Sequence, residues 1–230
     1  MKRLLTAFIL LLVACASEEE QNTFNVIGDY YGAKVTYTKG FSSEVGKKSE
    51  KHITLNLKGG PYIETEKPDQ LAVYAAVLLY VNLSDENANK YTHIKINLFD
   101  DQTQNEAIYK RTYDIATIKN IASKSENFQK TAQLLLDGAP EDIYNLLIKS
   151  YRNPQEKDDF VSVINKMHTE RSGIKSIKLL GVELLIDNNT KERYLGFNGQ
   201  VEWENDMKTA MSVRTFEDAT IKGLIHLNIK

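Results

Sequence analysis

The chain has 230 residues, of which 42% are hydrophobic and 26% charged, a balance typical of soluble globular proteins. Its formal net charge of −2 at pH 7 excludes a general electrostatic attraction to nucleic acid, so we expect no nucleic-acid partner. The single cysteine, Cys15, leaves no second thiol for an intrachain disulfide or a cysteine-based zinc site.

Residues 1–14 have the three parts of a secretory signal peptide. Met1 to Arg3 is basic, Leu4 to Val13 is an apolar run with one threonine, and small residues then lead into Cys15. About ten apolar residues are too few to cross a bilayer core, which takes about 20. The segment therefore predicts export followed by cleavage.

The sequence Leu12-Val13-Ala14-Cys15 resembles the lipobox of bacterial lipoproteins at all of its positions. The resemblance implies cleavage after Ala14, a diacylglyceryl thioether on Cys15 and N-acylation of the new terminus. The covalent lipid would be the only attached group, and we expect no cofactor. The alternative is an ordinary secretory signal, cleaved near Ala14 or Ala16, in which the cysteine has no role.

Lipid chains on Cys15 would hold the protein at a membrane without spanning it. Ala16 is not the aspartate that retains many enteric lipoproteins at the inner membrane, which favours the outer membrane. Residues 17–22 are acidic and are similar to the export tract of surface lipoproteins in the Bacteroidota. A solvated linker is equally compatible with this composition, so residues 15–23 leave the periplasmic and the surface side open.

Residues 24–122 predict an α+β lobe with the order β-β-α-β-β. Residues 24–33 read as a lead-in, and the apolar run 68–81 indicates a buried helix, with a buried strand as the alternative. The basic loop with Lys47 and Lys48 is too small to indicate nucleic-acid binding. The predicted strands are 34–41, 51–57, 92–99 and 107–118.

Two of these strands have nearly the same sequence. Residues 52–57 read HITLNL and residues 93–98 read HIKINL, with a looser echo at 225–229. Duplication and chance recurrence of a common strand pattern both account for this similarity.

Residues 123–230 predict a second α+β lobe made of helices and an antiparallel meander. The helices are predicted at 125–137, 140–153 and 158–173, and the strands at 174–186, 193–204, 208–216 and 221–229. The order of elements over 125–230 is similar to that of the cystatin/NTF2-like superfamily. The resemblance implies a sheet wrapped over a helix, a shape that hosts enzymes, inhibitors and binding modules. The predicted fold class is thus α+β with mainly antiparallel sheets.

The candidates for chemistry are few. The histidines have no metal-ligand spacing, so we expect them to face solvent rather than to bind a metal; they are His52, His93, His168 and His226. One group of side chains on the last sheet predicts a ligand face: Glu183, Glu202, Trp203, Glu204, Arg214 and His226. If this face curves, it forms an acidic pocket for a small ligand or a glycan. The simpler interpretation is a solvated face with cross-strand ion pairs.

No nucleophile elbow, P-loop, dinucleotide fingerprint or zinc motif occurs in the sequence, and no residue is predicted to be catalytic. We therefore expect a non-catalytic binding or scaffolding lipoprotein of the cell envelope, with a protein partner there. The alternative is an NTF2-like enzyme or a cystatin-like inhibitor that uses the sheet face around Trp203.

Overall fold

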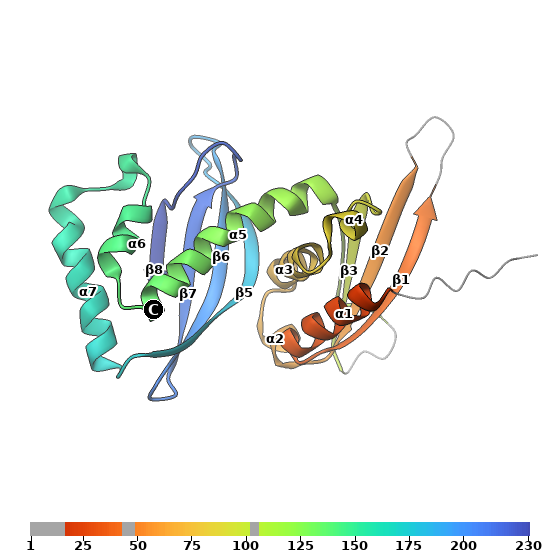
Figure 1. Cartoon of the computed structure of the whole chain (residues 1–230), viewed down its shortest axis with the longest axis horizontal. Coiled ribbons are helices and arrows are strands. Elements are labelled where there is room, and N and C mark those ends of the chain that lie inside the picture. The colour runs from red at the N-terminus through yellow and green to blue at the C-terminus, as the bar shows by residue number, and fades with distance from the viewer. Residues whose placement is uncertain (1–16, 43–48, 102–105) are drawn as a thin grey trace, which may run out of the picture.

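The computed structural model describes residues 17–42, 49–101 and 106–230, which form two four-stranded sheets joined and covered by helices (Figure 1). The predicted α+β class is confirmed. The signal peptide, Ala14, Cys15, Lys47 and Lys48 lie outside the described residues.

The first sheet and its helices come from the N-terminal half of the chain. The elements are α1 (Glu18–Tyr31), β1 (Lys34–Ser42), β2 (Glu50–Lys58), α2 (Pro61–Thr65), α3 (Pro68–Val81), α4 (Asp85–Ala88), β3 (His93–Phe99) and β4 (Tyr109–Asp114). The second half follows with α5 (Ile115–Leu136), α6 (Pro140–Leu146), the 3₁₀ turns η1 (Lys149–Tyr151) and η2 (Pro154–Glu156), α7 (Lys157–Glu170), β5 (Ile174–Ile186), β6 (Arg193–Trp203), β7 (Lys208–Phe216) and β8 (His226–Ile229).

The first sheet has the order β1-β2-β3-β4, and β2 and β3 are parallel. Helix α3 lies in the connection between these two strands, as a parallel pair requires. Their register pairs His52 with His93 and Leu57 with Leu98, so the two similar sequences lie side by side. Each therefore meets the same environment: apolar side chains on the covered face and polar ones on the other. The third echo lies in β8, in the other sheet.

Helix α1 covers two segments in which the sequence predicted no helix. The predicted lead-in at 24–33 and the solvated-linker interpretation of 17–22 are wrong, because both segments belong to this helix or its cap. The Ser17 side chain accepts a hydrogen bond from the Glu20 amide, and the Glu20 carboxylate accepts one from the Ser17 amide, which is a capping box. Three residues at helical spacing are buried: Phe24, Ile27 and Tyr31. Gly32, at φ 61°, ends the helix.

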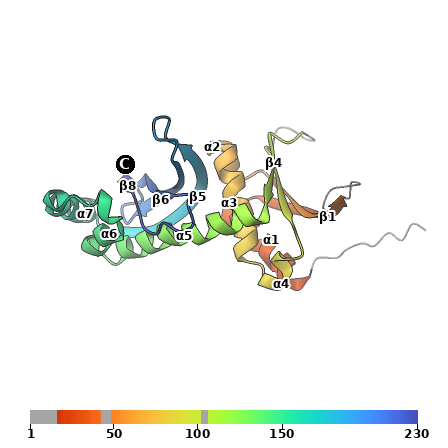
Figure 2. The same ribbon diagram turned by 90° about the horizontal axis from the view of Figure 1, so that it is seen from above.

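Helix α5 begins where the sequence predicted a strand. The predicted strand 107–118 ends at Asp114, whose side chain accepts a hydrogen bond from the Thr117 amide at 2.8 Å and caps the helix. The helix then continues to Leu136, contacting α3 near one end and the second sheet along the rest (Figure 2). The predicted lobe boundary between residues 122 and 123 falls inside this uninterrupted helix.

The second sheet is the predicted antiparallel meander, with the order β5-β6-β7-β8. The last strand of this sheet, β8, is shorter than predicted, and α6 ends before the predicted residue 153. The backbone segments next to these two ends are hydrogen-bonded to each other. Ile148 donates a backbone hydrogen bond to the Leu224 carbonyl at 2.8 Å, and Leu224 donates one to Leu146 at 2.9 Å. These bonds join the residues just after α6 to Leu224, which precedes β8, in an isolated β-bridge.

The cores of the two halves are continuous through α3 and α5. The predicted helix at 68–81 is confirmed, and its Ala72, Ala75 and Ala76 are fully buried, which lets the helix approach the sheet closely. On α5, Phe128 packs against Gly199, where a Cβ atom would lie 2.5 Å from the ring. The glycine thus admits a large aromatic ring against the inner face of the second sheet.

Candidate functional site

Trp203 does not belong to the predicted ligand face. Alternation along β6 places it on the inner face of the sheet, where only 1% of its surface is exposed. Its indole Nε1 donates to Thr209 Oγ1 at 2.9 Å, and the Arg171 guanidinium lies 4.8 Å from the ring centroid. The side chain therefore packs in the core, and the prediction that it lines a ligand face is wrong.

Three of the predicted site residues do share one cross-strand row on the outer face. Glu183 pairs with Gly196, Gly196 with Arg214, and Arg214 with His226. A Cβ at Gly196 would lie 2.9 Å from Glu183 Cγ, so the glycine leaves room for the glutamate to lie across β6. The meander thus brings together residues that are up to 43 positions apart, from 183 to 226.

The N-terminal end of α3 meets this outer face at Gln70, a residue that the sequence analysis did not single out. Its side-chain Nε2 donates to Glu183 Oε2 at 2.8 Å, and its Oε1 accepts from Asn198 Nδ2 at 3.1 Å. Only 8% of Gln70 is exposed. A Cβ at Gly181 would lie 2.9 Å from Gln70 Cβ, so only a glycine there allows the helix to approach this closely.

Beside this contact lies a cavity of about 540 Å³, which we call the Gln70 cleft. It lies between the outer face of the second sheet and the segment that joins α2 to α3. Its polar lining includes Glu66, Lys67, Gln70, Glu183, Asn198, Gln200, Lys208, Ser212, Arg214, Asn228 and Lys230. It combines amide, hydroxyl and charged groups, and so can orient a polar ligand.

The charges of the Gln70 cleft are unequal. Its side-chain cations are Lys67, Lys208, Arg214 and Lys230, and its carboxylates are Glu66 and Glu183. None of these four cations has an ion pair within 4.0 Å among the described residues. The two carboxylates also have no ion pair there, and Glu183 accepts a hydrogen bond from the neutral amide of Gln70, so the cations outnumber the side-chain carboxylates. The cleft therefore offers unpaired positive charge, which corrects the predicted acidic pocket.

The other predicted residues lie outside the lining. Glu202 accepts hydrogen bonds from Lys175 Nζ at 3.0 Å and Ser176 Oγ at 3.3 Å, and the bond from Lys175 lowers the pKa of this carboxyl. Glu204 follows β6 and is exposed. His226 is exposed, but partial desolvation of its ring, together with the neighbouring charge of Arg214, lowers its pKa below the usual value. We therefore expect a neutral imidazole at pH 7.

The remaining histidines are spread over the fold. His52 and His93 share a row of the first sheet with Gly40 and Asp114. His168 lies edge-on to Trp203, with the two ring centroids 6.2 Å apart. Across residues 17–42, 49–101 and 106–230, no group of three or more histidine, cysteine or carboxylate side chains is placed to hold a metal ion.

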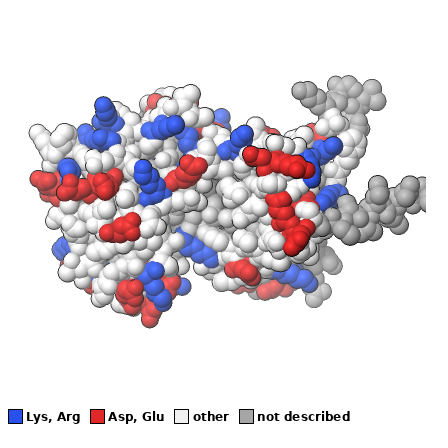
Figure 3. Space-filling view, viewed as in Figure 1, with Lys and Arg blue, Asp and Glu red and all other residues white. Residues whose placement is uncertain are grey.

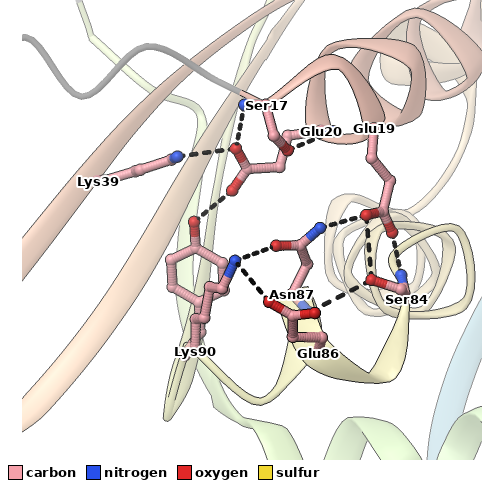
Figure 4. Close-up of polar contacts among 9 residues, drawn as sticks. Ser17, Glu19, Glu20, Lys39, Ser84, Glu86, Asn87 and Lys90 are labelled. Carbon is pink, nitrogen blue, oxygen red and sulfur yellow. Dashed lines mark hydrogen bonds and ion pairs between the residues drawn. The ribbon is translucent and has the colours of Figure 1, made fainter.

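A second polar network closes the start of α1 (Figure 4). The buried Glu20 carboxylate accepts hydrogen bonds from Lys39 Nζ at 2.8 Å and Tyr91 Oη at 2.6 Å, besides its bond to Ser17. Burial alone would raise the pKa of Glu20, but the bonds from Lys39 and Tyr91 outweigh it and lower the pKa. We call this network the Glu20 clasp. It leaves only Ala16 between Cys15 and the folded body.

Glu19, the preceding residue, is tied to the loop at α4. Its carboxylate accepts hydrogen bonds from the Ser84 amide and hydroxyl and from Asn87 (Figure 4). The bond from the Ser84 amide is the main reason why the pKa of Glu19 is lowered. Glu19 and Glu20, two of the three acidic residues at the start of the body, thus have structural partners.

Comparison with family models, with curated protein sequences and with solved structures finds no match to this chain. None of the helices in the described part of the chain is both long and apolar enough to cross a bilayer.

Proposed function

We propose that the protein is a lipid-anchored binding protein of the cell envelope that takes up an anionic ligand in the Gln70 cleft. The unpaired charge of the cleft is the observation that carries the proposal. Arg214, Lys208 and Lys230 line one cavity and have no ion pair within 4.0 Å among the described residues, and a carboxylate or phosphate group on a ligand could pair with them.

The polar groups beside these cations favour binding over a reaction. Gln70 holds Glu183 and Asn198 in fixed positions through hydrogen bonds, so the lining is organised before a ligand arrives. His226, the histidine nearest in register to Arg214, does not line the cavity. We therefore assign the cleft to recognition of a free ligand or of an acidic group on an envelope protein partner.

The anchor is proposed from the lipobox-like sequence that ends in Cys15. Because the Glu20 clasp makes Ser17 the first residue of the folded body, a lipid on Cys15 would hold that body directly at the membrane surface. The outer membrane is the proposed location, and protease treatment of intact cells decides between its surface and its periplasmic side.

Mass spectrometry of the mature protein tests the anchor. We expect a diacylglyceryl group on Cys15 and an acylated amino terminus. The variant Cys15→Ser should accumulate as an uncleaved precursor. A mature protein with an unmodified Cys15 would contradict the anchor and leave the binding proposal standing.

A thermal-shift screen with dicarboxylates and phosphate monoesters tests the cleft. Ligands that raise the melting temperature should lose this effect in Arg214→Gln and in Lys208→Gln. The matched controls are Arg111→Gln and Lys119→Gln, two exposed cations outside the cleft. The absence of any stabilising anion, or an equal loss in the controls, would contradict the proposal.

A further inference from the structure

The outer face of the first sheet has no covering element among the described residues. Helices α1 and α3 pack on its other face, over the apolar side chains of β2 and β3 (Figure 1 and Figure 2). Burial alternates along β2 and β3, so that every second side chain points away from these helices. The sheet therefore presents one open surface.

Three neighbouring rows of this open surface carry lysines and no carboxylate. The rows are Lys34–Lys58–Phe99, Thr36–Asn56–Asn97–Lys110 and Thr38–Thr54–Lys95–Thr112. We call the surface formed by these eleven residues the lysine face. The next row contains Asp114, but its carboxylate caps α5 through Thr117. The positive charge of the three rows is thus not neutralised from within the sheet.

The arrangement of the lysines is costly for the fold. Lys34 and Lys58 are direct cross-strand partners, and like charges directly opposite each other destabilise a sheet. No lysine of the lysine face has an ion pair among the described residues. On the side of the molecule shown in Figure 3, by contrast, acidic and basic residues are interspersed. A bound polyanion would reduce the repulsion between Lys34 and Lys58, because no carboxylate in the three rows offsets their charge.

We propose that the lysine face binds an acidic polysaccharide. The lysines supply the charge complementarity, and the side chains between them supply hydrogen-bonding groups suited to sugar hydroxyls. Asn97 Nδ2 donates to Asn56 Oδ1 at 2.8 Å, and Asn56 Nδ2 donates to Thr36 Oγ1 at 3.3 Å. This ladder holds the amides in place, and each retains further donor or acceptor capacity. The inference concerns a different surface from the Gln70 cleft and does not depend on the cleft.

Two observations favour a polysaccharide over other polyanions. Phe99, at the end of the first row, is the single aromatic side chain of the three rows, whereas binding of single-stranded nucleic acid relies on several aromatic platforms on which successive bases stack. Lys34 follows the C-terminal end of α1, a helix of 14 residues, so it lies about 20 Å along the sheet from Ser17. For Lys34 and its partner Lys58, that distance exceeds the screening length of about 8 Å at physiological salt, which disfavours contact of these two lysines with a membrane reached through Cys15. Only this second observation rests on the proposed anchor.

Titration of the full chain with polygalacturonate tests the inference, with neutral dextran as the uncharged control. We expect binding that weakens with salt, and an affinity for polygalacturonate about tenfold lower in the double variant Lys95→Gln/Lys110→Gln. The matched control is Lys119→Gln/Lys130→Gln, which removes the same charge from the exposed side of α5. It should bind as the unchanged protein does.

The variant Lys58→Glu separates binding from folding. It should weaken polygalacturonate binding while raising the melting temperature, because it replaces the repulsion of Lys34 with an attraction. No binding at low salt, an equal loss in the α5 control, or equally tight binding of single-stranded DNA or anionic vesicles would overturn the inference. None of these results bears on Cys15 or on the Gln70 cleft.

Discussion

The two sheets alternate apolar and polar residues in the same way but use their outer faces differently. The first sheet leaves its outer face open, and the face is rich in lysine and threonine. The second is covered in part, because Gly181 and Gly196 let Gln70 and Glu183 lie against the strands. Two glycines, which have no side chain, are thus what allows part of an otherwise solvated sheet face to form one wall of a cleft.

Loss of Phe128 should cause the largest effect, because it removes the ring that fills the inner face of the second sheet. Phe128→Ala should lower the free energy of unfolding by about 3–5 kcal/mol. Phe41→Ala removes the same ring from a side chain that is 63% exposed on the first sheet and should change stability by less than about 0.5 kcal/mol. Urea denaturation measures both. Equal losses would show that burial does not distinguish the two positions.

Loss of the Glu20 carboxylate should have the next largest effect. Glu20→Gln breaks the buried contact with Lys39 and should cost about 2–3 kcal/mol at pH 7, less than for a fully buried pair because Lys39 reaches solvent. Because the pKa of Glu20 is lowered from 4.5 in the folded state, its contribution is present above that value and is lost as the pH falls through the folded pKa.

The difference between the unchanged protein and Glu20→Gln should therefore shrink as the pH falls below 4.5 and through the lowered pKa of folded Glu20. Urea denaturation at several pH values measures it. A difference that stays constant with pH would show that the charge of Glu20 contributes nothing.

Removal of the Gln70 amide tests whether its contacts with the outer face of the second sheet stabilise the fold and the cleft. Gln70→Ala leaves Glu183 and Asn198 without their shared partner and should cost about 1–2 kcal/mol. It should also reduce the melting-temperature shifts that anionic ligands produce. Gln129→Ala, at an exposed position of α5, is the control and should leave both quantities unchanged. If anionic ligands shift the melting temperature of Gln70→Ala as much as that of the unchanged protein, the Gln70 amide does not contribute to ligand binding in the cleft.

The smallest effect is expected on the open face of the first sheet. Lys58→Glu should raise the free energy of unfolding by about 0.2–1 kcal/mol, because an opposite charge then faces Lys34. The gain should disappear in 1 M salt, where the screening length is about 3 Å. A decrease in stability at low salt would mean that Lys34 and Lys58 do not repel each other.

Local patterns were sufficient to predict most of the sheets. Alternation located β1, β2 and β6, and the apolar run with Pro68 at its start located α3. Helix α1 was missed although Ser17 and Glu20 have the spacing of a capping box, a signal that the sequence does contain. The start of α5 was harder to find, because the residues after Asp114 are as compatible with a strand as with a helix.

The candidate site depends on contacts that no local pattern contains. Glu183 and Arg214 could be predicted to share a face, because both belong to the polar set of the meander. The approach of Gln70 to Gly181 depends on how α3 packs against a sheet more than 100 residues later in the chain. The pairing of Lys34 with Lys58 likewise depends on strand register.

The most direct test of the binding proposal is a crystal structure of the protein with the anion that stabilises it most in the thermal-shift screen. The account predicts that the acidic group of the ligand lies within hydrogen-bonding distance of Arg214 or Lys208, inside the cavity beside Gln70. An empty Gln70 cleft, with the ligand bound elsewhere on the protein, would contradict it.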